Sequence, residues 1–333
     1  MSSVREIASR VGVSVATVSR VINNDPRVSE SMRNRVLKAA NQTRYVPKEG
    51  SRSTMNIALL YTDEPSLESP FDAALMQGMG ERMDEFGFDL MILRGSRTRN
   101  PSETYTQMLM RKGVRGAVIR TTSRTRAACE EIATEGFPAV VVGDRFQNPR
   151  VSFVSSDSRS GSREATEHLL KLGHRRIAIC TNIVDDSDHA DRILGYSDAL
   201  SAAGLEVNPN LVVRTPANRP GGKQIIRRIM TGSDCPTAVY MVDPMAAVGA
   251  MHELLYMGLK VPGDVSLIGF DDGELRHLMQ PTMTAVCQDA TEIGREAFEV
   301  LHSLIGASGR SQVYRRILPT VLEIHGSTAA APV

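Results

Sequence analysis

Apolar side chains recur at helical spacing through the first 24 residues, and a single glycine interrupts them. The pattern predicts a short first helix that ends near Gly12 and a second helix over residues 15–22, capped by Ser14. The inward positions are Val4, Ile7, Ala8 and Val11 on the first helix and Val18, Val21 and Ile22 on the second. Two short helices around a sharp turn form a helix-turn-helix.

The outward face of the second helix has a composition that suits a DNA groove. Its side chains are Ala16, Thr17, Ser19, Arg20 and Asn23. Hydroxyl and amide groups bind phosphates, and an arginine can bind the edge of a guanine. The pattern therefore indicates DNA binding through this helix.

Past the second helix, the periodicity changes twice. A third helix is expected over residues 30–43 with Ser29 as its cap, and the polar residues 48–54 have no apolar period and are interpreted as a linker. From Asn56 onward, short apolar runs alternate with amphipathic segments. The predicted strands are 56–61, 88–93, 116–120, 139–143, 176–180, 238–242, 265–270 and 313–322, and the predicted helices are 73–86, 103–112, 126–135, 161–172, 193–203, 221–231, 246–257 and 292–304.

This alternation predicts parallel sheets covered by helices on both faces. Roughly 270 residues of it exceed one ordinary sheet, so two doubly wound subdomains with a cleft between them are expected. Ligands of open parallel sheets bind at the carboxyl ends of the strands, which makes the cleft the expected small-molecule site.

Charge is distributed unevenly along the 333 residues, whose formal net charge is only +1. Residues 1–56 contain ten Lys or Arg against four Asp or Glu, a balance of +6, whereas the remainder has a balance of −5. A basic head on a mildly acidic body is typical of a protein that contacts nucleic acid at one end.

Other classes of protein find little support. There is no apolar run of membrane-spanning length and no signal-peptide pattern, and Cys129, Cys180, Cys235 and Cys287 are scattered, so a cytoplasmic protein without a membrane partner is expected. No histidine has metal-ligand spacing with another His or Cys, so no metal or other cofactor is expected. An enzyme is disfavoured because the phosphate-binding, dinucleotide-binding and nucleophile-elbow motifs are missing, and the adjacent Asp271 and Asp272 would point to opposite faces of a strand.

Several motifs in order resemble the lactose-repressor (LacI) family of bacterial transcription regulators over essentially the full length. They are Ile7-Ala8, Gly12-Val13-Ser14, Thr17 to Asn23, Val28-Ser29, Tyr45-Val46-Pro47, Gly173 to Ile177, Arg192 to Tyr196, Val261 to Asp272, and Pro281 with Thr284 and Gln288. The resemblance implies a small all-α helix-turn-helix head and an α/β body like a periplasmic binding protein. The implied division is a DNA-binding domain over 1–47, a hinge over 48–56 and an effector-binding and dimerisation domain over 57–328, with an N-subdomain of about 57–155 and 290–315 and a C-subdomain of about 156–289 and 316–328.

The resemblance also implies a repressor that binds a near-palindromic operator as a homodimer, although a tetramer is also compatible. Val15, Ala16 and Arg20 would contact bases, and the other DNA-binding residues would be Ser14, Thr17, Ser19, Asn23, Ser29 and Tyr45. Capping is an equally good explanation for each hydroxyl taken singly. The effector residues carried over are Asp144, Arg192, Asp271 and Gln288. Effector binding in the cleft would change the angle between the subdomains, and with it the spacing of the two heads.

Three departures from the family pattern limit what the resemblance implies. The segment after Pro47 is about a turn shorter than the usual hinge and contains no leucine to insert into the minor groove. Val242-Asp243 replaces the usual Asn-Asp, and no aromatic residue stands near Ala217 to stack on a ligand. The effector could therefore be a sugar, a nucleoside or another metabolite, or the regulator could respond to a protein or to no effector. The remote alternative is a solute-binding protein, which shares the two-subdomain body. It is disfavoured because it would lack the DNA-binding head.

Overall fold

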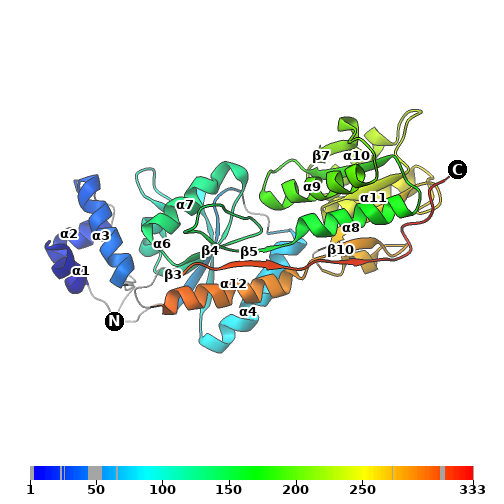
Figure 1. Cartoon of the computed structure of the whole chain (residues 1–333). Helices are drawn as coiled ribbons and strands as arrows, with labels where there is room; N and C mark the ends of the chain where they lie inside the picture. Colours follow the sequence, from blue (N-terminus) through cyan, green and yellow to red (C-terminus); the bar gives the residue numbers. More distant parts are fainter. Residues whose placement is uncertain are drawn as a thin grey trace. The chain divides into compact units, whose positions relative to one another are not determined.

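The computed structural model describes residues 4–22, 25, 27–43, 55–64, 67–271, 273–307 and 312–332 (Figure 1). The chain divides into two compact units. Unit 1 comprises Met1–Pro65, Gln77–Val154 and Gly294–Arg316, and unit 2 comprises Ser66–Met76, Ser155–Ile293 and Ile317–Val333. The chain passes repeatedly between the units, so neither is a continuous stretch of sequence.

The amino-terminal helices form where the apolar spacing predicts them. They are α1 (Val4–Val11), α2 (Val15–Ile22) and α3 (Glu30–Thr43). The α1–α2 turn is set by Gly12, whose φ of 73° favours glycine and whose N–H donates to the Ala8 carbonyl. Arg35 of α3 donates to the Val11 carbonyl at 3.0 Å and so ties the third helix to the end of the first. The side chains of Ile7, Val18, Val21, Val36 and Ala40 are completely buried in these helices.

The first six-stranded sheet has the order β11-β5-β4-β3-β1-β2, and the pairings from β5 to β2 are parallel. Its strands are β1 (Asn56–Tyr61), β2 (Asp89–Arg94), β3 (Val114–Arg120), β4 (Ala139–Val142), β5 (Ser152–Ser156) and β11 (Arg315–Leu318). The helices between and after them are α4 (Pro70–Phe86), α5 (Gly95–Thr98), α6 (Tyr105–Arg111), the 3₁₀ turn η1 (Ser123–Thr125), α7 (Arg126–Glu135) and α12 (Ala290–Gly306).

The second sheet, in unit 2, has the order β12-β10-β9-β8-β6-β7, and all its pairings are parallel except that of β12 with β10. Its strands are β6 (Ile177–Asn182), β7 (Val212–Thr215), β8 (Ala238–Met241), β9 (Ser266–Asp271), β10 (Thr284–Cys287) and β12 (Val321–Glu323). Its helices are α8 (Ser158–Lys171), α9 (Ser187–Ala202), η2 (Pro209–Leu211), α10 (Arg219–Ile229), α11 (Pro244–Tyr256) and η3 (Leu275–Leu278). Every residue of β8 and β9 is buried, as expected for parallel strands covered on both faces.

Close helix packing fixes the position of α9 on α8. A Cβ built on Gly195 of α9 would lie 2.1 Å from the Arg159 carbonyl oxygen and 2.8 Å from the Arg163 backbone nitrogen. Only a residue without a side chain allows this approach, which accounts for the glycine in the Arg-x-x-Gly-aromatic motif. The same contact fixes where the first turns of α9 lie relative to the sheet.

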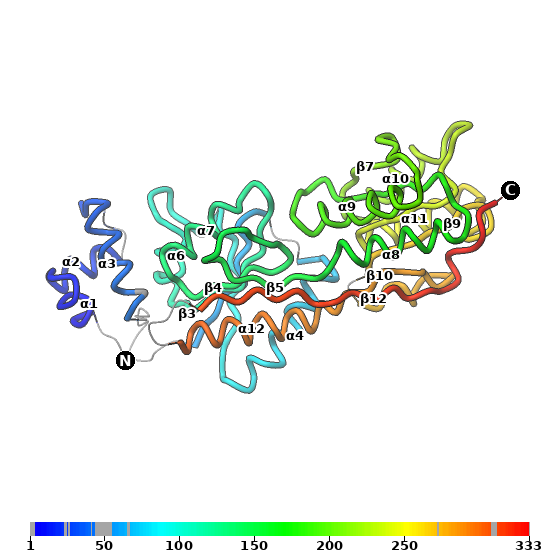
Figure 2. The backbone as a smooth tube through the Cα atoms, in the orientation of Figure 1, coloured from blue at the N-terminus to red at the C-terminus, as the bar shows by residue number. Residues whose placement is uncertain are grey.

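The predicted fold class is confirmed, but several elements differ from the prediction. The single strand expected over 313–322 is wrong: β11 lies beside β5 and β12 beside β10, in different sheets (Figure 2). Pro319, which has no backbone N–H to donate, lies between the two strands. The short strands β5, β7 and β10 were not predicted. Helix α9 begins six residues earlier than expected because Asp186 caps a polar first turn that has no apolar period.

No helix in the described part of the chain is both long and apolar enough to cross a membrane.

Candidate functional site

Helix α2 is divided into a buried and an exposed face, as its sequence predicts. Val18 and Val21 are fully buried and Ile22 nearly so, whereas Val15 is 46% exposed. Ala16, Ser19 and Arg20 are exposed and Thr17 is half-buried. The five residues of α2 that are expected to contact DNA therefore lie on the surface or at its margin.

The hydroxyl groups near the helix starts have structural partners. Ser14 Oγ accepts a hydrogen bond from the Thr17 backbone N–H at 3.1 Å and lies 2.9 Å from Thr17 Oγ1. Ser29 Oγ accepts from the Met32 N–H at 3.4 Å. Ser14 and Ser29 thus act as N-caps of α2 and α3, so any phosphate contact would be additional to this role. Asn23 and Tyr45, together with Lys48 and the rest of the linker, lie outside the described residues.

Arg20 differs from Arg27, Arg33 and Arg35, three arginines nearby in the sequence whose side chains are engaged within the protein. Arg27 donates to Asp25 through Nε and Nη2, and Arg33 and Arg35 donate to backbone carbonyls. Among the described residues the Arg20 guanidinium has no hydrogen-bond partner and is attracted to Asp25 only at longer range. Within the part of the chain that the structure describes, none of its five N–H donors is used, so they can bind an external acceptor.

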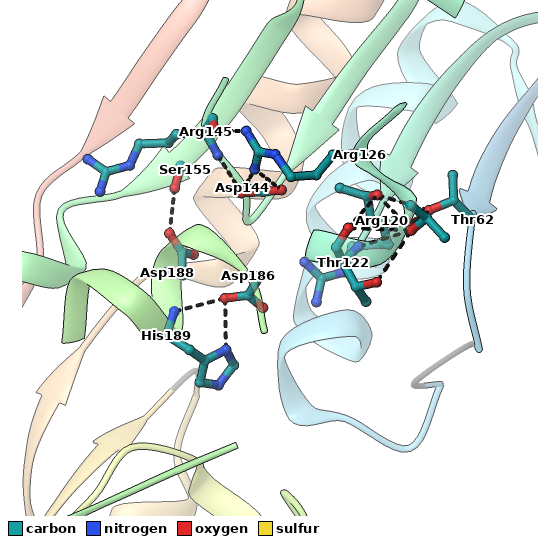
Figure 3. A network of polar contacts seen from close by, with 12 residues as sticks. Thr62, Arg120, Thr122, Arg126, Asp144, Arg145, Ser155, Asp186, Asp188 and His189 are labelled. Atoms are coloured by element: carbon teal, nitrogen blue, oxygen red, sulfur yellow. Dashed lines mark hydrogen bonds and ion pairs between the residues drawn. The ribbon is translucent and has the colours of Figure 1, made fainter. Parts of the chain in front are cut away.

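At the carboxyl edge of the first sheet, threonines form a compact hydroxyl cluster. Thr62, which follows β1, hydrogen-bonds to Thr121 at 3.0 Å and to Thr125 at 2.8 Å, and Thr121 and Thr125 lie 3.1 Å apart (Figure 3). Beside it, Thr122 donates to Asp63 at 3.0 Å. These bonds are all within unit 1 and connect the ends of β1 and β3.

Asp144 is fully buried two residues after β4 and is engaged by an ion pair. Arg126 Nη1 donates to both of its carboxylate oxygens, and the Arg145 backbone N–H donates to Oδ1 at 2.9 Å (Figure 3). The Arg126 guanidinium carbon lies 3.9 Å from the centre of the Phe146 ring. A ligand could contact Asp144 only alongside this ion pair or by displacing it.

Four polar side chains gather where the parallel strands of unit 2 end. Asp186 follows β6, Asp243 follows β8, Asp271 ends β9 and Gln288 follows β10. The carboxyl ends of parallel strands lie at one edge of a sheet, so these residues share that edge. We call this group, together with His189 and Arg192 of α9, the unit 2 edge site.

His189 lies between two carboxylates of this site. Its Nδ1 is 2.8 Å from Asp186 Oδ1, and the Asp186 carboxylate also caps α9 by accepting from the His189 N–H (Figure 3). On the other side of the ring, His189 Nε2 is 3.2 Å from Asp243 Oδ1. Burial acts to lower the pKa of His189, but the two carboxylates outweigh it and raise the pKa to about 10. Burial acts to raise the pKa of Asp186, but attraction to His189 outweighs it and lowers the pKa to about 2. His189 is therefore a buried cation at neutral pH.

A further carboxyl group, Asp188, accepts a hydrogen bond from Ser155 at 2.8 Å (Figure 3). Burial, followed by repulsion from Asp186, raises the pKa of Asp188 to about 6. A carboxyl group with this pKa exchanges its proton slightly below neutral pH.

Arg192 supplies the donor side of the unit 2 edge site. Its Nη1 donates to the Val242 carbonyl at 2.7 Å, and its guanidinium carbon lies 3.7 Å from the centre of the Phe270 ring. Arg192 Nε and Asp243 Oδ2 are both buried and have no hydrogen-bond partner within the described residues. One donor and one acceptor at the same sheet edge are thus available for a ligand, and leaving such groups unpaired costs roughly 1–3 kcal/mol each.

The two remaining predicted residues make hydrogen bonds within the protein. Asp271 Oδ2 accepts from Arg276 Nη1 at 3.0 Å and from the Arg276 backbone N–H at 3.2 Å. Gln288 Oε1 accepts from Ser156 at 2.6 Å. Both side chains are fixed in orientation by these bonds.

The structure therefore brings together three of the four effector residues expected from the sequence, namely Arg192, Asp271 and Gln288. Asp144 belongs to unit 1. Sequence reasoning missed Asp186 and His189, and it named Asp243 only as the neighbour of Val242, the residue that removes a polar contact. The available signal was the three-residue spacing of Asp186 and His189, which is the spacing of a helix cap and the third residue of its helix.

The comparisons with known proteins agree with both parts of this description. Residues 3–48 match the family model described as bacterial regulatory proteins, lacI family, and residues 166–328 match a periplasmic binding protein-like domain. The HTH-type transcriptional regulator DegA of Bacillus subtilis is 31% identical over 98% of both chains. The ribose operon repressor of Haemophilus influenzae is 32% identical over 90% of this chain and 91% of its own.

Solved structures give the same result. The transcriptional regulator CelR in complex with cellobiose is 29% identical with a TM-score of 0.73, covering 98% of this chain and 100% of its own. A LacI family regulator from Enterococcus faecium with bound ribose is 25% identical with a TM-score of 0.72, covering 83% of this chain and 100% of its own. The chain belongs to the lacI family of bacterial regulatory proteins, which are DNA-binding transcription regulators and not enzymes.

Proposed function

We propose that this chain is a repressor that binds a near-palindromic operator as a homodimer, with α2 of each copy in a major groove. The observation that carries the proposal is Arg20, exposed on α2 with its guanidinium donors available. Val15 and Ala16 beside it offer apolar contact to a thymine methyl group, and Ser14, Thr17, Ser19, Asn23, Ser29 and Tyr45 complete the proposed DNA contacts. Residues 1–47 would form the DNA-binding domain, 48–56 the hinge and 57–328 the regulatory body.

DNA binding by the purified full chain tests this proposal. The preferred site would first be selected from random duplexes, and affinity then measured by fluorescence anisotropy. Arg20→Ala should weaken binding to that site by about 5- to 150-fold, equivalent to about 1–3 kcal/mol, and relax preference at one base pair per half-site. Lys38→Ala, which removes an exposed charge from α3, is the matched control and should leave the preferred sequence unchanged. Equal affinity of wild type and Arg20→Ala would contradict the assignment of α2.

We propose further that the effector is a small molecule with several hydroxyl groups, of the sugar class, bound at the unit 2 edge site. Arg192 Nε can donate to a hydroxyl or ring oxygen, and Asp243 Oδ2 can accept from a hydroxyl. The charges of these groups balance, because three carboxylates (Asp186, Asp243 and Asp271) are matched by three cations (His189, Arg192 and Arg276). A neutral ligand therefore suits the site. A regulator with bound ribose and another bound to cellobiose are among the similar structures, which supports this class.

Calorimetric titration with ribose, cellobiose and a panel of other neutral sugars tests the effector proposal. Arg192→Ala and Asp243→Asn should each weaken binding of an active sugar at least tenfold, since each leaves a buried ligand hydroxyl unpaired. Arg228→Ala, an exposed position on α10, should not change it. The same sugar must also alter operator affinity, because an effector acts only through different affinities for two states. Binding of purines or of no small molecule would overturn the sugar assignment while leaving the DNA-binding proposal intact.

A further inference from the structure

Three potential metal ligands converge on the surface of unit 2, and none of them is among the residues assigned above. One nitrogen each of His277 and His325 and one carboxylate oxygen of Glu323 all lie within 4.8 Å of one another. The side chains of these residues are 28–41% exposed, so an ion could reach them from solvent. No other group of three His, Cys, Asp or Glu side chains comes together in this way among the described residues.

Backbone structure brings the three side chains together from distant parts of the sequence. Glu323 ends β12, the edge strand of the sheet, and His325 follows two residues later, so the two side chains lie on the same side of an extended segment. His277 lies on η3, and its ring centre is 5.3 Å from that of His325. His325 is anchored at the backbone, because its N–H donates to Thr284 Oγ1 at 2.9 Å and its carbonyl accepts from the same hydroxyl at 3.1 Å.

Glu323 is already held in position by an arginine. Arg276 donates from Nε to Glu323 Oε2 at 2.7 Å and from Nη2 to Oε1 at 3.1 Å. Each carboxylate oxygen has two lone pairs, so these bonds leave acceptor capacity on the side facing the histidines, where His325 Nε2 is 3.3 Å from Oε2. A hydrogen-bonded carboxylate is the usual state of a metal-ligating one.

We propose that His277, Glu323 and His325 form a binding site for a transition-metal cation of the Zn²⁺ class. Two imidazoles and one carboxylate are a ligand set of open zinc sites, in which a water or an external group completes the coordination. Ligand atoms around such an ion are separated by about 3.3–3.5 Å, so the present spacing requires only small side-chain rotations. Imidazole ligands favour Zn²⁺, Cu²⁺ and Ni²⁺ over Mg²⁺ and Ca²⁺, which take oxygen ligands.

Arg276 connects the proposed metal site to the unit 2 edge site. The same guanidinium that holds Glu323 donates through Nη1 to Asp271 at the unit 2 edge site. Coordination of Glu323 by a cation would draw its charge away from Arg276 and leave Arg276 more strongly paired with Asp271. The metal site itself does not depend on the sugar proposal.

Isothermal titration of the chelator-treated full chain with ZnCl₂ tests the proposal. Wild type should bind one ion per chain at this site, and His277→Ala combined with His325→Ala should weaken that binding at least about tenfold. His252→Ala, an exposed histidine on α11, is the matched control and should bind as wild type does. His277 is exposed and His325 half-buried, and unchanged operator binding and circular dichroism would establish that the double variant is folded.

Two results would overturn the proposal. One is a Zn²⁺ affinity and stoichiometry that are the same in wild type and the double variant. The other is sulfur coordination, seen as a thiolate-to-metal charge-transfer band when Co²⁺ replaces Zn²⁺, which would place the ion on cysteines instead. Binding of Co²⁺ without that band, lost in Glu323→Gln as well as in the double variant, is the expected outcome.

Discussion

His189 is a buried cation, and its positive charge is stabilised by the two carboxylates that contact it. Asp186 and Asp243 contact its two ring nitrogens. Removing the charge of one member of such a buried group leaves the others uncompensated. The orientation of Asp243, whose second oxygen is available to a ligand, therefore depends on a residue that does not itself need to touch that ligand.

The stability of the chain should depend on pH through His189. Because the pKa is higher in the folded chain (about 10) than in the unfolded one (about 6.5), His189 stabilises the fold fully below about pH 6.5, and the stabilisation is lost as pH rises through 10. His189→Gln should lower the free energy of unfolding by about 2–4 kcal/mol near pH 7, and the difference from wild type should shrink toward pH 10. Urea unfolding followed between pH 6 and pH 10 measures this. A difference that stays constant across that range would contradict it, and His252→Gln should change stability by less than about 0.5 kcal/mol.

Asp188 also makes the stability of the folded chain decrease as pH rises, over a lower pH range than His189. Its pKa is raised to about 6 in the folded chain, so folding is favoured fully below about pH 3.8 and this contribution is lost as pH rises through 6. Asp188→Asn keeps a polar group for Ser155 without an ionisable proton. This variant should be at least as stable as wild type at pH 7.5 and should lose that relative advantage at pH 4.5, as measured by thermal unfolding at the two pH values.

Helix α9 carries His189 and Arg192, and its position depends on how closely it packs on α8. Gly195 lies one turn beyond Arg192, where backbone atoms of α8 leave no space for a methyl group. A helix shift at this point would move both side chains of the unit 2 edge site together. The packing of two helices thus sets the geometry of a polar site several residues away.

Gly195→Ala should destabilise the chain by about 1–3 kcal/mol, because a Cβ here meets backbone and not a flexible side chain. It should also weaken sugar binding through the displacement of Arg192. Gly80→Ala is the matched control, since Gly80 lies within α4 with nothing within 4 Å of the added Cβ, and it should stabilise the chain by about 0.5–1 kcal/mol. Thermal unfolding of the two variants provides the comparison, and equal melting temperatures would contradict the proposed role of the glycine.

At the scale of the whole molecule, charge distinguishes the two proposed activities, DNA binding and sugar binding. The positive balance lies in residues 1–56, whereas the sugar class proposed for the unit 2 edge site is uncharged. DNA binding releases counterions in proportion to the phosphates neutralised, and binding of a neutral sugar does not.

Operator affinity should therefore fall steeply with salt, by about 10³- to 10⁵-fold between 50 and 200 mM if six to ten phosphates are contacted. Sugar affinity should change by less than about twofold over the same range. Anisotropy and calorimetry on the same preparation measure the two quantities. A sugar affinity that varies as steeply as that for DNA would indicate a charged effector.

Local patterns in the sequence were sufficient for much of the fold. The spacing of apolar residues predicted α1, α2 and α3, and the exposed face of α2, because a helix is determined by contacts within a few residues. The buried apolar runs likewise predicted β1 and β9 and the parallel α/β class. The family motifs further indicated Arg192, Asp271 and Gln288 as candidate effector residues.

Only the tertiary structure decided which distant residues meet. The division of 313–322 between two sheets, the ion pair of Arg126 with Asp144, the placement of His189 between Asp186 and Asp243, and the approach of His277 to His325 all join segments far apart in the sequence. Such contacts depend on strand order and helix packing, which a one-dimensional periodicity does not contain. The sequence by itself determined a DNA-binding regulator with a two-sheet body, and the tertiary structure decided which of its charges are paired inside the protein and which are available to a ligand.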